Sequence, residues 1–186
     1  DADGPWLTVN GAVLDWNRRA LLRGRLDVQE LTAEEILMPR RPQGQAKTNA
    51  PTPEAQPFSL PDLPVAIEIG RISAQRIELG QPVIGEAAEL TLDGSASLAG
   101  GSGAVDITAE RLDAETGTFR IAGSFDSGSR ELQIDVSVDE GPDGIIASLI
   151  DLPGRPALSA TIDGSGPLSE FDTSIELTTD GEPRLA

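Results

Sequence analysis

The strongest constraint on the fold is an alternation of apolar and polar side chains that recurs along the chain from residue 65 to residue 177. In the stretch 132–139, for example, every even position holds Leu, Ile or Val, and every odd position holds Gln, Asp or Ser. Successive side chains of a β-strand point to opposite faces of the sheet. The alternation therefore predicts strands that each carry one apolar face and one face in contact with water.

Short turn signals separate these runs, and strands joined by short turns are typically consecutive and antiparallel. Aromatic residues make up only 3% of the chain, and Tyr is absent. Because compact cores draw heavily on aromatic side chains for buried area, this composition favours an extended sheet or trough with an aliphatic interior. We expect an all-β fold, an elongated antiparallel meander, with turns at Gly100-Gly101, Asp126-Ser127-Gly128-Ser129, Pro153-Gly154 and Gly166-Pro167.

The apolar positions of the alternating runs are the candidate functional residues, because they form the wall of the predicted trough. Three glycines, Gly94, Gly123 and Gly164, occupy positions where an apolar residue would continue the pattern. A strand glycine marks either a bulge or bend, or a place where a ligand approaches closely. The predicted lining consists of Leu90, Leu92, Leu98, Val105, Ile107, Phe119, Ile121, Leu132, Ile134, Val136, Leu158, Ile162, Ile175 and Leu177.

The segment 143–151 departs from the period of two. Ile145, Ile146, Leu149 and Ile150 fall on one helical stripe, with Asp143 placed to cap the start and Pro153-Gly154 placed after the end. A helix of about two turns is unstable without packing, so its apolar stripe needs a surface to cover. We expect a short helix that plugs the inner face of the sheet, and a mobile lid is the alternative.

The N-terminal part also indicates strands, over residues 6–9, 12–16 and 22–38. In the last of these, Leu26, Val28, Ile36 and Met38 are the expected inward residues, and Leu31 is expected at a bend between two strands.

Residues 40–58 have a different composition, rich in Pro, Gln, Ala and Thr, which holds no strand ladder and has little to bury. We expect a disordered loop there. The organisation predicted is a single β-trough segment spanning residues 1–186, and the loop-like start at 1–5 favours a piece of a longer protein.

Composition excludes several kinds of chemistry. The chain has neither Cys nor His, which removes the Ser-His-Asp triad, the Cys-His dyad, and His- or thiolate-bound metals. None of the 31 acidic residues belongs to a recognisable catalytic motif, and no phosphate-binding glycine loop is present. We therefore expect no enzyme activity, no cofactor and no metal. The net charge of −17 disfavours nucleic acids and anionic membrane surfaces as partners.

Several short motifs, in this order, resemble the N-terminal region of the TamB family of translocation and assembly proteins. Together they extend over nearly the whole chain. They are Gly4-Pro5-Trp6-Leu7, Leu14-Asp15-Trp16-Asn17, the stretch 21–28, the stretch 60–65, the stretch 79–85, Asp143-Gly144-Ile145-Ile146-Ala147, the stretch 152–156, and Gly164-Ser165-Gly166-Pro167-Leu168.

The resemblance implies a protein of Gram-negative bacteria that is anchored in the inner membrane and crosses the periplasm. The family is similar to AsmA-like and bridge-like lipid-transfer proteins, whose long sheets are curled lengthwise into a trough, a shape called a β-taco. It implies movement of phospholipids between the inner and outer membranes, and support for outer-membrane protein assembly. The implied partners are phospholipid acyl chains, a TamA-like outer-membrane barrel that regions outside this chain would contact, and nascent outer-membrane proteins.

Two other functions are consistent with the same strands. A chaperone or scaffold would hold outer-membrane β-strands by adding them to a sheet edge. A two-sheet β-sandwich would act as an adhesin or a carbohydrate-binding module, although the absence of Tyr leaves few aromatic side chains for a sugar site. The ligand discriminates between these functions: acyl chain on the face of the sheet, peptide along its edge, or sugar.

Overall fold

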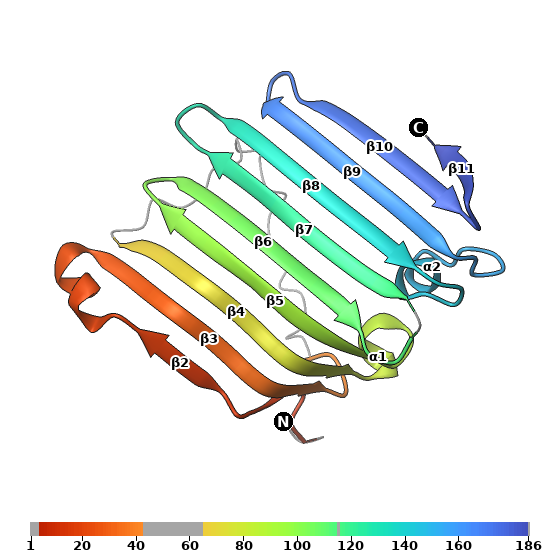
Figure 1. The fold of residues 1–186 in the computed structure, drawn as a ribbon, viewed down its shortest axis with the longest axis horizontal. Helices are drawn as coiled ribbons and strands as arrows, with labels where there is room; N and C mark the ends of the chain where they lie inside the picture. Colours follow the sequence, from red (N-terminus) through yellow and green to blue (C-terminus); the bar gives the residue numbers. More distant parts are fainter. Residues whose placement is uncertain (1–3, 43–64, 115, 186) are drawn as a thin grey trace, which may run out of the picture.

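A computed structural model describes residues 4–42, 65–114 and 116–185. Their strands form one 11-stranded open sheet, with β1 and β2 both pairing with β3 at one edge and β11 at the other (Figure 1). The strands are β1 (Thr8–Asn10), β2 (Val13–Trp16), β3 (Arg25–Met38), β4 (Ala66–Leu79), β5 (Ala88–Ala99), β6 (Ser102–Arg111), β7 (Gly117–Asp126), β8 (Glu131–Glu140), β9 (Leu158–Pro167), β10 (Asp172–Thr179) and β11 (Glu182–Leu185).

The expected all-β sheet is confirmed, and from β5 to β11 each strand is antiparallel to the one before it. The expected meander is wrong at one place, because β3 and β4 run parallel. A parallel pair needs a crossover connection rather than a tight turn, and the long segment between Met38 and Ala66 provides it. The loop predicted at 40–58 falls, from residue 43 onward, outside the described residues.

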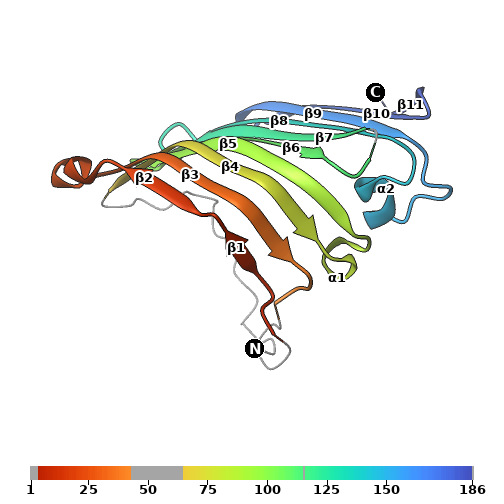
Figure 2. The same ribbon diagram turned by 60° about the horizontal axis from the view of Figure 1, so that its bottom comes forward.

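Three short helices lie at the ends of strands: η1 (Arg18–Arg23), α1 (Gln81–Ile84) and α2 (Ile145–Leu149). Of these, only α2 was predicted. Figure 2 shows a twisted, curved sheet, with α1 and α2 at one end of the strands and η1 projecting from the other end. No second sheet covers either face in the described part of the chain, so the two-layer arrangement of a sandwich is not formed there.

Strands β3 and β4 keep one apolar face although their sequences break the period of two. Relative to β5, the register of β4 shifts between Ile69 and Ile72 and again between Ala74 and Ile77. Each shift is a β-bulge, which inserts one residue and restores the side chains that follow it to the original face. The strand β3 carries matching steps and runs unbroken through Leu31, so the expected bend at Leu31 is wrong.

The hairpin between β7 and β8 is closed by one carboxylate. Asp126 accepts hydrogen bonds from the backbone N–H of Ser129 at 2.7 Å and from the Ser129 hydroxyl at 3.0 Å. It also accepts one from the Ser102 hydroxyl, which ties the hairpin to β6. These bonds lower the pKa of Asp126 to about 2, and the bond from Ser102 has the largest effect. The turn therefore holds its carboxylate ionised far into the acid range.

Gly94, in β5, lets the neighbouring strand β6 approach closely. A Cβ atom at this position would lie 2.4 Å from the backbone oxygen of Asp106, in β6. Gly94 also pairs with Ile72 at the β4 bulge, which supports the structural reading of this glycine. We predict that Gly94→Val lowers the free energy of unfolding by about 2–3 kcal/mol, because the strands must separate to admit the side chain. Urea denaturation measures this.

The matched control is Ser95→Val, one residue further on and on the polar face. Val suits a strand, so this change is expected to alter stability by less than about 0.5 kcal/mol. Equal stabilities for the two variants would contradict the packing described here.

Candidate functional site: the apolar face of the sheet

The pairing register places all fourteen predicted lining residues on one face of the sheet, which we call the apolar face. Residues directly opposite each other on paired strands share a face. One row shows this clearly: Ile107, Ile121, Val136, Ile162 and Ile175 are successive partners across β6 to β10. The other predicted residues fall in neighbouring rows of the same strands. The alternation in the sequence therefore identified a continuous aliphatic surface.

No second layer covers this surface in the described part of the chain. Of the fourteen side chains only Leu158 is buried, Ile121 and Ile175 are 53% and 42% exposed, and the other eleven are half-buried. Among the described residues no large side chain is completely buried, and five of the nine buried hydrophobic residues are alanines. An exposed apolar area of this extent marks an interaction surface more often than ordinary protein surface.

A hollow of about 420 Å³ lies on the apolar face over β5 to β8. Gly103 and Gly123 contribute to its lining, and the absence of side chains there leaves room between the larger neighbours. The side chains of the apolar face that surround them are aliphatic, apart from one aromatic ring, and comprise Leu98, Val105, Ile121, Phe125, Leu132, Ile134 and Val136. The volume is within the range of small-ligand sites, and the lining suits a hydrocarbon.

The three predicted glycines have different surroundings. A Cβ at Gly123 would lie 3.1 Å from the backbone oxygen of Gln133, and Gly164 lies under the ring of Phe171. Both glycines pair with Ile134, from opposite sides. They accommodate close neighbours, and only Gly94 lies opposite a bulge.

Two charged residues interrupt the apolar face, and sequence reasoning missed both. Arg111 and Glu140 occupy one row, each opposite an aliphatic residue (Leu90 and Leu158, respectively). They are the only charged side chains on the apolar face of the described parts of β3 to β10. Their position at the ends of the alternating runs 105–111 and 132–140 was the available signal.

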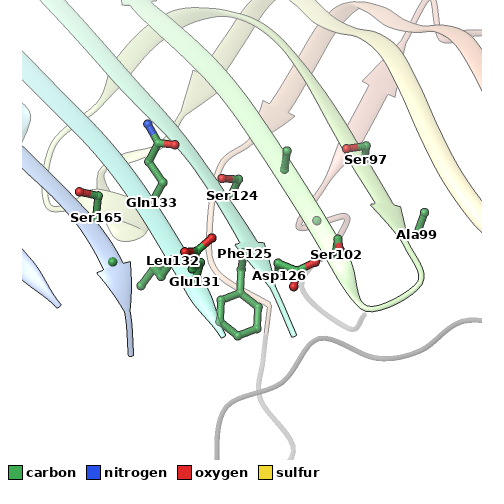
Figure 3. A pocket seen from close by; sticks show the side chains of 13 residues that line it. Ser97, Ala99, Ser102, Ser124, Phe125, Asp126, Glu131, Leu132, Gln133 and Ser165 are labelled. Carbon is green, nitrogen blue, oxygen red and sulfur yellow. Dashed lines mark hydrogen bonds between the residues drawn. The ribbon is translucent and has the colours of Figure 1, made fainter. Parts of the chain in front are cut away.

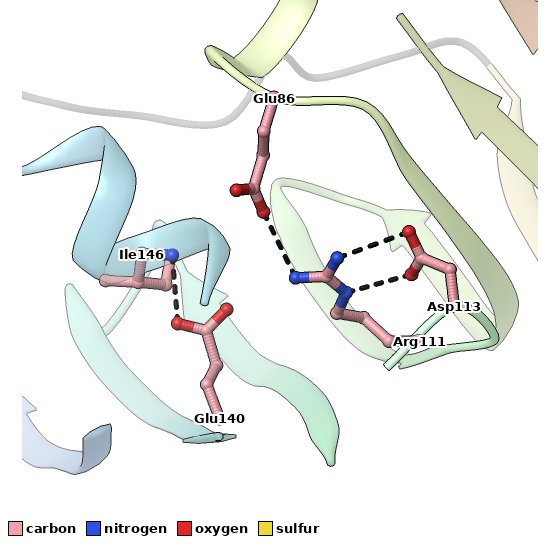
Figure 4. Close-up of polar contacts among 5 residues, drawn as sticks. All are labelled: Glu86, Arg111, Asp113, Glu140 and Ile146. Carbon is pink, nitrogen blue, oxygen red and sulfur yellow. Dashed lines mark hydrogen bonds and ion pairs between the residues drawn. The ribbon is translucent and has the colours of Figure 1, made fainter. Parts of the chain in front are cut away.

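Both charges hold the connections at this end of the sheet (Figure 4). The Arg111 guanidinium contacts Asp113 at 3.0 Å and Glu86, just after α1, at 3.1 Å. The hydrogen bond from Arg111 to Asp113 raises the pKa of the guanidinium further above its ordinary value. Two carboxylates thus compensate the charge of this half-buried guanidinium.

Glu140 holds α2 against the apolar face. Its carboxylate accepts a hydrogen bond from the backbone N–H of Ile146 at 2.9 Å, which satisfies a free donor in the first turn of the helix. The expected cap, Asp143, lies outside the helix, which begins after Gly144 without a side-chain cap. The residue is only 3% exposed, and its Oε1 atom has no hydrogen-bond partner among the described residues. Burial raises the pKa of Glu140, against the opposing effects of the α2 backbone N–H groups and Arg111.

The helix α2 covers less of the sheet than its sequence predicted. Ile145 is buried and Ile146 half-buried, whereas Leu149 and Ile150 are exposed. The helix spans only five residues, so Ile150 lies at its end rather than on a continuing stripe. Ala147, which has the smallest side chain of this group, is completely buried. The predicted stripe of four side chains on the sheet is therefore wrong for its second half.

The polar face carries its own hollow, of about 700 Å³, near the hairpins β5–β6 and β7–β8 (Figure 3). Uncharged polar side chains of one row line part of it, namely Ser97, Ser124, Gln133 and Ser165. No pattern in the sequence indicated this hollow, because such residues are ordinary on a solvated strand face.

Comparisons with known proteins do not identify a relative: no family model, no curated protein and no solved structure matches the chain. The described residues contain no group of three or more potential metal-ligating acidic side chains. In the same residues, no helix has the length and hydropathy needed to cross a bilayer.

The raised pKa of Glu140 predicts a pH dependence that Glu140→Gln removes. A carboxyl with a higher pKa in the folded state contributes most stability below the unfolded pKa, and this contribution is lost as pH rises through the folded value. The stability difference, wild type minus variant, is therefore expected to decrease from pH 4 to pH 7. Urea denaturation at both pH values measures it, and a difference that increases with pH would contradict the assignment.

Proposed function

We propose that the apolar face is a groove that carries the acyl chains of phospholipids. The observation that carries this proposal is the exposure of a continuous aliphatic surface on a single-layer sheet, from β3 to β10. A hydrocarbon chain lying on this face would remove from water both its own surface and that of the sheet. The aliphatic lining gives no hydrogen bonds to select a particular ligand, which suits a cargo recognised by hydrophobicity alone.

The energetic benefit to such a cargo is large. Each CH₂ group exposed to water costs about 0.8 kcal/mol, so an acyl chain of roughly 16 carbons faces a cost on the order of 10 kcal/mol in bare solution. Strands about 4.8 Å apart give the ten-strand path of this sheet a length on the order of 45 Å. Contact along the groove removes much of this cost without a strong local binding site.

The motif resemblance supports a cellular setting for this groove. We place the chain in a TamB-like protein of the periplasm, anchored in the inner membrane, that conducts phospholipids between membranes and supports outer-membrane protein assembly. A TamA-like barrel would be contacted by other regions of such a protein. No catalytic step is needed for passive conduction, in keeping with a chain that lacks His and Cys.

The alternative, a scaffold for outer-membrane β-strands, would use the edges of the sheet. At one edge, β11 has only four residues and includes Pro183, which has no N–H to donate. At the other edge, β1 and β2 are short and are separated by Gly11, with φ of 61°. Short, interrupted edges with Pro resist strand addition, so these features favour a ligand on the face of the sheet.

A charge on the apolar face is expected to abolish the proposed binding. We predict that Ile121→Asp weakens the binding of a fluorescent acyl-chain phospholipid by at least about tenfold, equivalent to 1.4 kcal/mol, because the cargo would desolvate the new carboxylate. Ile121 is exposed, so the variant is expected to fold. Fluorescence titration and transfer between vesicles are the measurements.

The control is Ser124→Asp, on the same strand but on the polar face, where the side chain is exposed. It adds the same charge and is expected to bind and transfer lipid like the wild type. Undiminished transfer by a folded Ile121→Asp variant would contradict the proposed function.

A further inference from the structure

A cationic, apolar turn projects from the acidic sheet. The helix η1 has the sequence Arg-Arg-Ala-Leu-Leu-Arg and joins β2 to β3. It therefore concentrates three of the chain's 14 basic residues within six positions, in a protein of net charge −17. Figure 2 shows the coil beyond the end of the strands, at the opposite end of the sheet from α1 and α2.

The leucines of η1 are exposed to an unusual degree. Leu22 is 89% exposed, more than any other large hydrophobic residue in the described part of the chain, and Leu21 is 44% exposed. Neither belongs to the groove, because both lie outside the strands that form the apolar face.

This exposure is held in place by the local structure. The Asn17 side chain caps the start of η1 by accepting a hydrogen bond from the backbone N–H of Arg19, and Ala20 is buried beneath the turn. Gly24 ends the helix in the left-handed region, with φ of 69°, and its N–H donates to carbonyl groups of the last turn. A turn capped at both ends presents Leu22 to solvent as a fixed feature of the fold.

The positive charges of the arginines beside these leucines are available to a binding partner. Arg18, Arg19 and Arg23 are exposed, and none forms an ion pair with a carboxylate of the described residues. Arginines on the strands differ in this respect: Arg71, Arg76 and Arg120 each pair with at least one acidic side chain. The guanidinium of Arg18 lies 6.0 Å from the centre of the Trp16 ring, which adds an aromatic group to the base of the turn.

We propose that η1 inserts into the surface of a bilayer that contains anionic phospholipids, with Leu21 and Leu22 among the upper acyl carbons and the three arginines at the headgroups. Cationic residues flanking exposed leucines are the pattern of interfacial membrane contacts, and Trp favours the same interface. Although the whole chain is strongly acidic, the screening length of about 8 Å at physiological salt lets a projecting basic turn approach a surface that repels the rest of the protein. The contact area of one short turn is small for a stable protein–protein interface, which favours lipid over a protein partner. This proposal does not rest on the groove function.

Vesicle flotation tests the proposal with the 186-residue chain. Binding to vesicles of phosphatidylcholine with phosphatidylglycerol is expected, with weaker binding to pure phosphatidylcholine and a decrease at high salt. Each arginine near an anionic surface contributes roughly fivefold in affinity, so replacing Arg18, Arg19 and Arg23 with Gln should weaken binding on the order of 100-fold. Leu22→Ser, which keeps every charge, should weaken binding by at least about fivefold.

Matched variants keep the experiment specific. Replacing Arg71, Arg130 and Arg155 with Gln changes the net charge by the same amount elsewhere, and Leu112→Ser removes another exposed leucine, at the opposite end of the strands. Both are expected to bind vesicles like the wild type.

Equal losses for the η1 variants and their controls would overturn the proposal, as would the absence of wild-type binding to anionic vesicles. Self-association without vesicles that requires the three η1 arginines would also overturn it, in favour of a second acidic copy as the partner.

Discussion

Backbone pairing between neighbouring strands is the interaction on which this structure depends. A single-layer sheet has no opposing layer to bury its apolar side chains, so most of its order comes from ladders of hydrogen bonds and from cross-strand contacts within one face. The register is therefore the critical feature, because a slip of one residue would move every apolar side chain to the polar face. The bulges in β4 and the polar ties of the hairpins, such as Asp126 to Ser102, help to fix it.

The two ends of the strands differ in whether charged side chains lie on the apolar face. Where α1 and α2 lie, Arg111 and Glu140 bring charge onto the apolar face and use it to hold connecting segments. Toward the other end, the face carries no charged side chain and is hollowed around Gly103 and Gly123. If the apolar face is a groove, α1 and α2 lie at one end of its strands, and the hollow is where it has the most room for a ligand.

The sequence predicted the face well where strands are regular and poorly where they are not. From β5 to β10 the period of two identifies the apolar face, because tight hairpins keep consecutive strands in simple register. In β3 and β4 the bulges change the parity, so Leu31 looked like a break rather than part of the wall. The parallel pairing was not predictable from local pattern, because the alternation of side chains is the same in both directions. The turn η1 was missed because Leu22 was taken as the start of the strand that follows.

Site-specific photo-crosslinking tests the central claim most directly, by identifying what lies on the apolar face. A photoreactive amino acid would replace Ile121 on the apolar face or Ser124 on the polar face of the same strand, in protein isolated from cells without added lipid. The groove account predicts phospholipid adducts at position 121 and few at position 124, as seen by mass spectrometry after irradiation. Peptide adducts at position 121, or lipid adducts of equal yield at both positions, would contradict it.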